Sequence, residues 1–174
     1  TRARRYDRAL RDFDAAIEAD PRYATAFSQR GKVYHLRGDD GRARADCDRA
    51  IRLDPRSPTA YCHRAMAWCG LHEPGKAIED CGTALRLDRE CGLAHCVRAH
   101  ACLLEGDADR ALHDCDEAIW LDRKLPAAYL YRGRARAAKD DHARAIEDYT
   151  SALWLDQKLA EAHRRRPRRF GPSR

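Results

Sequence analysis

Two cysteine–histidine groups are the residues best suited by type to hold a soft metal ion: Cys62 with His63, and Cys96 with His100. Cys62 and Cys96 are 34 residues apart, and no C-x-x-C motif occurs in the chain. The spacing follows from a repeat described below rather than from ligand geometry. We therefore predict no metal site, and reduced cysteines in a cytoplasmic protein.

Catalytic motifs are also absent from the sequence. There is no P-loop, no glycine-rich dinucleotide turn, no H-E-x-x-H and no G-x-S-x-G. The remaining histidines and acids are explained by the repeat. We therefore predict that the chain is not an enzyme and needs no cofactor.

The basic charge is concentrated at the C-terminus. Lys and Arg total 34 against 28 Asp and Glu, but six arginines fall within the last eleven residues. Without these eleven residues the basic and acidic residues balance, so the charge pattern disfavours a nucleic-acid-binding surface. The Arg164–Arg169 run could be a solvated end cap, a contact for nucleic acid or acidic partners, or a targeting signal. No apolar run is long enough to span a membrane.

Alanine and aspartate recur with a period of 34 residues. Each of five independent series has five members and no insertion, which excludes chance. The series begin at Ala9, Asp12, Ala16, Asp20 and Ala26. The sequence therefore predicts a repeat architecture.

Each repeat contains two short helical patterns. In residues 24–57, apolar residues recur with spacings of 3, 4 and 7 on both sides of a break at Gly38-Asp39. Gly38 can end the first helix in a left-handed conformation, and Asp39 can cap the second. Ser57-Pro58 opens the next repeat as a helix start. The pattern predicts an all-α solenoid of helix-turn-helix units, in which each unit packs on its neighbours.

This period and pattern resemble the tetratricopeptide repeat (TPR) family. Counting from Ala24, the small residues of unit positions 8, 20 and 27 are Gly31, Ala43 and Ala50, and equivalents follow every 34 residues. Cysteine replaces the usual aromatic at position 24, as in Cys47. The resemblance implies one continuous domain: a partial first repeat over 1–23 containing the second helix only, repeats at 24–57, 58–91, 92–125 and 126–159, and a short terminal helix with the Arg-rich tail at 160–174.

Arginine occupies unit position 7, where the family usually has an apolar residue. Because the turn is centred near position 15, position 23 is its mirror partner on the second helix. That position is aspartate in every full unit. We predict four structural pairs that tie the two helices of each unit together: Arg30 with Asp46, Arg64 with Asp80, Arg98 with Asp114, and Arg132 with Asp148.

The resemblance also implies a concave groove, which the first helix of each unit lines. The implied lining residues are Ser28, Gln29, Lys32, His35, Cys62, His63, Met66, Cys69, Cys96, Val97, His100, Leu130, Tyr131 and Arg134. The middle of this set is apolar and its ends carry single positive charges. Neither the basic clamp that some family members use for acidic chaperone tails nor the asparagine ladder of others is matched.

Three functions follow as hypotheses. The leading one is a non-enzymatic scaffold that binds a protein or peptide, either an extended peptide or a partner helix, in the groove. It implies no small-molecule substrate and no membrane association. The second is a regulatory or targeting module cut from a larger, possibly enzymatic, protein, because the first unit lacks most of its first helix. The third is a nucleic-acid-associated scaffold that uses the arginine tail.

Overall fold

The computed structural model describes residues 2–165, which form nine helices and no strand. No helix among these residues is long and apolar enough to cross a membrane. The helices are α1 (Arg2–Ala19), α2 (Ala24–Leu36), α3 (Asp40–Leu53), α4 (Pro58–Gly70), α5 (Pro74–Leu87), α6 (Gly92–Glu105), α7 (Ala108–Leu121), α8 (Pro126–Ala138) and α9 (His142–Arg165). The all-α class predicted from the repeat is confirmed.

The turn within each hairpin passes through a left-handed residue at unit position 15. Gly38 and Gly106 adopt φ of 81° and 83° there, a conformation that glycine takes without steric cost. His72 and Asp140 adopt φ of 60° at the equivalent positions. Asp39 then accepts a hydrogen bond from the backbone N–H of Arg42, which caps α3 as predicted.

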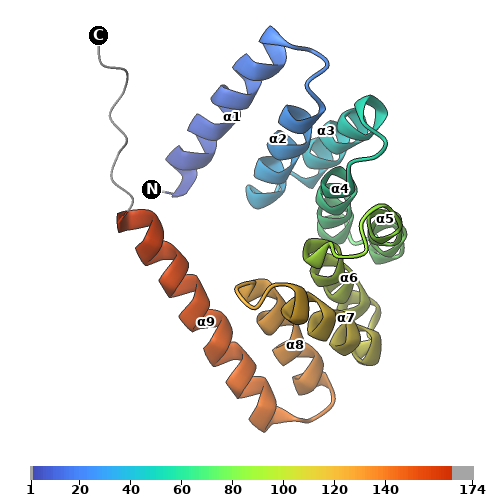
Figure 1. Ribbon diagram of the computed structural model, residues 1–174, viewed down its shortest axis with the longest axis vertical. Helices are drawn as coiled ribbons and strands as arrows, with labels where there is room; N and C mark the ends of the chain where they lie inside the picture. Colours follow the sequence, from blue (N-terminus) through green and yellow to red (C-terminus); the bar gives the residue numbers. More distant parts are fainter. Residues whose placement is uncertain (1, 166–174) are drawn as a thin grey trace.

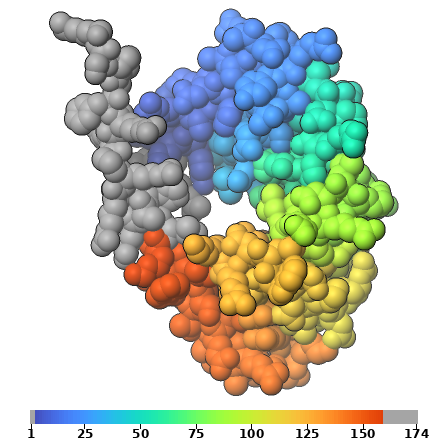
Figure 2. Space-filling view, viewed as in Figure 1, coloured from blue at the N-terminus to red at the C-terminus, as the bar shows by residue number. Residues whose placement is uncertain are grey.

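The hairpins stack into a curved solenoid (Figure 1). Helices α2, α4, α6 and α8 pack successively against one another as an inner layer, while α3, α5 and α7 each also contact the following inner helix. Figure 2 shows an opening at the centre of the curve, next to segments coloured blue, green and amber. The curvature thus leaves one side of the inner layer facing this opening.

Small side chains form the core. Ala43, Ala77 and Ala111 are fully buried, and so are Cys47 and its equivalents Cys81 and Cys115. A Cβ atom added at Gly31 would lie 2.8 Å from Cys47 Sγ and 2.9 Å from the carbonyl oxygen of Ala43. The two helices of the hairpin therefore approach too closely to admit a larger residue at this position.

The C-terminal helix differs from the sequence prediction. We expected a separate short helix beginning at residue 160, but α9 continues without a break from His142 to Arg165. Earlier units end their second helix at Asp54, Asp88 or Asp122, where the backbone becomes extended and the next inner helix packs on the hairpin. Gln157 occupies the place of Pro55 and supplies no backbone restriction of its own. The predicted basic tail lies outside the side chains that the structure describes.

Candidate functional site

The concave face is built by the inner helices, and six of the fourteen predicted lining residues are buried beneath it. Their side chains lie between packed helices, so they are not available on the groove surface in this structure. The closely packed alanines and cysteines bring successive inner helices together and cover these positions. The six are Ser28, Cys62, His63, Cys69, Cys96 and Val97, each with a relative exposure of 5% or less.

The other eight predicted residues remain at least partly accessible, and every inner helix contributes to them. Their chemistry is mixed: two permanent cations, one amide, two histidines and three apolar or aromatic side chains. They are Gln29, Lys32 and His35 of α2, Met66 of α4, His100 of α6, and Leu130, Tyr131 and Arg134 of α8.

An aromatic stack connects α6 and α8 within this set. The rings of His100 and Tyr131 lie parallel, with centroids 4.7 Å apart and an interplanar angle of 5°. Burial, together with the nearby charges of Arg134 and His35, lowers the pKa of His100 to about 4. The His100 ring is therefore neutral at physiological pH, so the stack is an apolar, planar surface beside a cationic side chain.

His63 connects the first two full repeats beneath the concave face. Its Nδ1 lies 2.9 Å from Ser28 Oγ and 3.1 Å from the carbonyl oxygen of Ser28. Because a carbonyl oxygen can only accept, Nδ1 carries the hydrogen that it donates to Ser28. Burial, aided by the charge of Lys32, lowers the pKa of His63 to about 4. His63 is thus a neutral, hydrogen-bonded core residue.

His35 is oriented by an acid from the same hairpin. Its Nδ1 lies 2.5 Å from Asp40 Oδ1 at the start of α3. Asp40 in turn lies against the last residue of α4, where a Cβ atom at Gly70 would come within 2.6 Å of all three carboxyl-group atoms. The absence of a side chain at Gly70 therefore leaves room for the carboxylate that holds His35.

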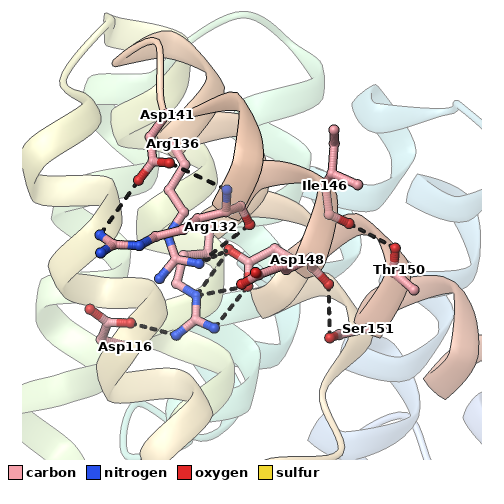
Figure 3. Close-up of polar contacts among 10 residues, drawn as sticks. Asp116, Arg132, Arg136, Asp141, Ile146, Asp148, Thr150 and Ser151 are labelled. Carbon is pink, nitrogen blue, oxygen red and sulfur yellow. Dashed lines mark hydrogen bonds and ion pairs between the residues drawn. The ribbon is translucent and has the colours of Figure 1, made fainter.

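The four predicted Arg–Asp pairs are present within their hairpins. In the first three, the arginine Nε and Nη2 donate to the two oxygens of the aspartate, with distances of 2.6 to 2.8 Å. Arg132 donates to Asp148 through the same nitrogens at 2.8 to 3.2 Å, and Arg136 adds a further bond at 2.9 Å (Figure 3). The aspartates are 2 to 9% exposed, so these bidentate hydrogen bonds pair carboxylates that are largely shielded from water.

A third bond from the same arginines links neighbouring repeats, and the sequence analysis missed it. Nη1 of Arg30 donates to Asp14 at 2.8 Å, and Nη1 of Arg64 donates to Asp48 at 2.8 Å. Arg132 donates to Asp116 at 2.7 Å (Figure 3). Each of these three arginines therefore joins both helices of its own hairpin to the second helix of the preceding one. The signal was available in the sequence, as aspartates at 14, 48 and 116 that follow the 34-residue register.

The repeat at 92–125 departs from this arrangement. Gly82 occupies the register position of Asp48 and Asp116, so Arg98 has no carboxylate there. The aromatic residue that stacks on the arginine in the other three units, as Tyr61 does at 5.6 Å from Arg64, is replaced by His95. His95 Nδ1 lies 3.0 Å from Asp114 Oδ1 instead. The junction before this repeat thus lacks the arginine-mediated connection.

Metal binding finds no support in the side-chain arrangement. Among the described residues, no group of three or more His, Cys, Asp or Glu side chains is placed to hold a metal ion. Cys62 and Cys96 are buried in different hydrophobic clusters, whose other members are mainly alanine and leucine. Burial raises the pKa of Cys96 to about 12, so its thiol stays protonated.

Comparison with known proteins agrees with this architecture. Residues 2–58 match the family model described as tetratricopeptide repeat. No curated protein sequence matches the chain. Among solved structures, TTC0263 of Thermus thermophilus, described as a thermophilic TPR protein, superimposes with a TM-score of 0.81 and 20% identity, covering 92% of this chain and 88% of the other.

Two further structures are similar in fold at comparable identity. MamA aligns with a TM-score of 0.65 at 24% identity, over 90% of this chain and 91% of its own. YrrB, described as a TPR protein with an unusual peptide-binding site, aligns with a TM-score of 0.59 at 23% identity, over 93% and 84%. The match of residues 2–58 to the family model, the 34-residue register and the stacked hairpins of the described residues show a tetratricopeptide-repeat-like fold.

Proposed function

We propose that the protein is a non-enzymatic interaction scaffold that binds an extended peptide or a partner helix on its concave face. The observation that carries this proposal is the set of eight accessible side chains, which every inner helix helps to form. TPR proteins are generally protein-interaction modules, and the description of YrrB refers to peptide binding in that protein.

The composition of the face favours a partner with an apolar centre. Met66 and the neutral His100–Tyr131 stack offer apolar surface between α4 and α8, while Lys32 and Arg134 place permanent positive charges on α2 and α8. A segment with aromatic or aliphatic residues near its middle and acidic residues at its ends would match both features. The planar stack would supply contact area at low entropic cost, because its two rings already hold each other.

Selection from a display library of random peptides tests the proposal. Peptides that bind the wild-type protein are measured by fluorescence anisotropy against Tyr131→Ala and Arg134→Glu. The matched control is Arg49→Glu, which reverses a charge exposed on α3. We expect both groove variants to weaken binding about tenfold or more, as for an aromatic or charged residue central to an interface, and the control to leave it unchanged.

Loss of binding must also be separated from loss of folding. Circular dichroism melting of each variant provides that control, because all three sites are at least partly exposed. Selected peptides that bind the wild-type protein and both groove variants with equal affinity would show that the concave face is not the binding surface.

A further inference from the structure

Two cysteines, one of them buried beneath the concave face, approach each other at the junction between the repeats at 58–91 and 92–125. Cys62 lies on α4 and is fully buried, whereas Cys91 is partly exposed at the residue before α6. Their Sγ atoms are 3.9 Å apart, which is within sulfur hydrogen-bond distance. Both side chains belong to one cluster with Ala84, Ala94 and Leu85.

The two thiols differ in their readiness to lose a proton. The pKa of Cys91 is lowered to about 6, chiefly by its hydrogen bond with Cys62 and also by the backbone amides of Ala94 and Leu93 at the start of α6, against an opposing effect of burial. The pKa of Cys62 is raised, because its proton is held in the bond to Cys91 and its side chain is buried. Cys91 is also the partly exposed member of the pair, whereas Cys62 is fully buried, so Cys91 is the better-placed nucleophile.

The other cysteines are unlike Cys91. Cys47, Cys69, Cys81, Cys96, Cys102 and Cys115 are all buried, and burial raises the pKa of each. A small oxidant in solution therefore meets one partly exposed sulfur with thiolate character and a second sulfur directly behind it.

We propose that Cys91 and Cys62 form a peroxide-sensitive thiol pair that closes to a disulfide in the folded protein. The Cys91 thiolate attacks one oxygen of hydrogen peroxide and breaks the O–O bond, which yields the Cys91 sulfenic acid and, with one proton, water. The Cys62 sulfur then attacks the Cys91 sulfur, and the sulfenic hydroxyl leaves with the Cys62 proton as a second water. The two thiols are oxidised and one peroxide is reduced to two waters.

Bond formation requires only a local movement. The Sγ atoms must close from 3.9 Å to about 2.05 Å. Cys91 lies in the short turn before α6: its N–H donates to the Asp88 carbonyl oxygen at 3.3 Å, and its own carbonyl oxygen accepts from Ala94 at 2.9 Å and from His95 at 3.3 Å. Closure therefore requires this turn to shift toward α4. The disulfide would then fix the start of α6 to α4 across the junction that lacks an arginine connection.

Peptide mapping after oxidation of the native protein tests the pair directly. The protein is treated with a stoichiometric amount of hydrogen peroxide, remaining thiols are alkylated under denaturing conditions, and the digest is searched for the Cys62–Cys91 cross-link. We expect that cross-link to account for most of the oxidised protein. The oxidised form should melt higher by about 5 °C or more, because the bond closes a loop of roughly thirty residues.

Three serine variants assign the roles. Cys91→Ser should react with peroxide at least tenfold more slowly, and Cys62→Ser should accumulate a sulfenic acid at Cys91 that dimedone traps. Cys115→Ser, which changes a fully buried cysteine in another cluster, should oxidise like the wild type. An intermolecular dimer, oxidation spread evenly over the cysteines, or Cys91 sulfenic acid that persists in the wild type without the cross-link would each overturn the proposal.

Discussion

Acidification should destabilise the protein through His63 before its carboxylates are protonated. His63 is 1% exposed, and its pKa falls from 6.5 in the unfolded chain to about 4 in the fold. The folded state therefore does not take up a proton that the unfolded state binds below pH 6.5. The stability that neutral His63 supports is complete above pH 6.5 and is lost as the pH falls towards 4.

The size of the effect follows from the two pKa values. Each pH unit between them costs up to about 1.4 kcal/mol, so the loss at pH 5 is about 2 kcal/mol and the limit below pH 4 is about 3.4 kcal/mol. Urea denaturation followed by circular dichroism at pH 7.5 and pH 5.0 measures this loss. His100, whose pKa is also lowered to about 4, adds a loss of the same sign.

A glutamine variant isolates the contribution of His63. His63→Gln keeps a side-chain donor for the Ser28 carbonyl oxygen but has no group that titrates in this range. It should be less stable than the wild type at pH 7.5, yet lose about 2 kcal/mol less on going to pH 5.0. Equal losses in both proteins would mean that His63 takes up its proton in the fold at the same pH as in the unfolded chain, and the argument from its burial would be wrong.

Four further substitutions test the packing, the turns and the arginine connections by the same denaturation assay. Gly82→Asp should place a carboxylate in register with Arg98 and raise the free energy of unfolding by up to about 1 kcal/mol more than Gly82→Asn, which matches its backbone effect without the charge; equal gains would show that no ion pair forms. His72→Gly and Asp140→Gly should each stabilise by roughly 1 kcal/mol, since both residues have φ of 60°, and a loss would show that their side chains contribute more than the strain costs. Gly31→Ala should destabilise by about 1–3 kcal/mol through overpacking, and an unchanged midpoint would contradict the close approach found there.

The fold was predictable because every repeat carries the same pattern of helices and turn. A 34-residue period, two apolar stripes per period and Gly38-Asp39 between them are sufficient to define a stack of hairpins. The Arg–Asp pairs within hairpins were predictable from the same register, because mirror positions about a known turn must face each other. Neither prediction needed the distance between successive repeats.

Burial on the concave side was not predictable, because it depends on that distance. Alanine and cysteine at the inner positions let α2, α4 and α6 approach so closely that Cys62, His63 and Val97 are covered. The end of α9 also depends on tertiary packing, since a helix without a proline at its boundary ends where the following hairpin packs. Periodicity alone describes each helix and leaves these contacts between helices undetermined.

Because residue 82 is glycine, one junction between the described repeats has no inter-repeat arginine–aspartate pair. At the junctions before and after residues 88–91, an ion pair connects consecutive repeats. These pairs are Asp48–Arg64 before it and Asp116–Arg132 after it. At the junction at residues 88–91, the two repeats contact each other through apolar side chains and through the Cys62 and Cys91 sulfur atoms. These contacts orient the repeats less strictly than a bidentate arginine–aspartate pair does. The relative placement of the two halves of the solenoid therefore depends at this junction on apolar packing, without the arginine connection found at the junctions before and after it.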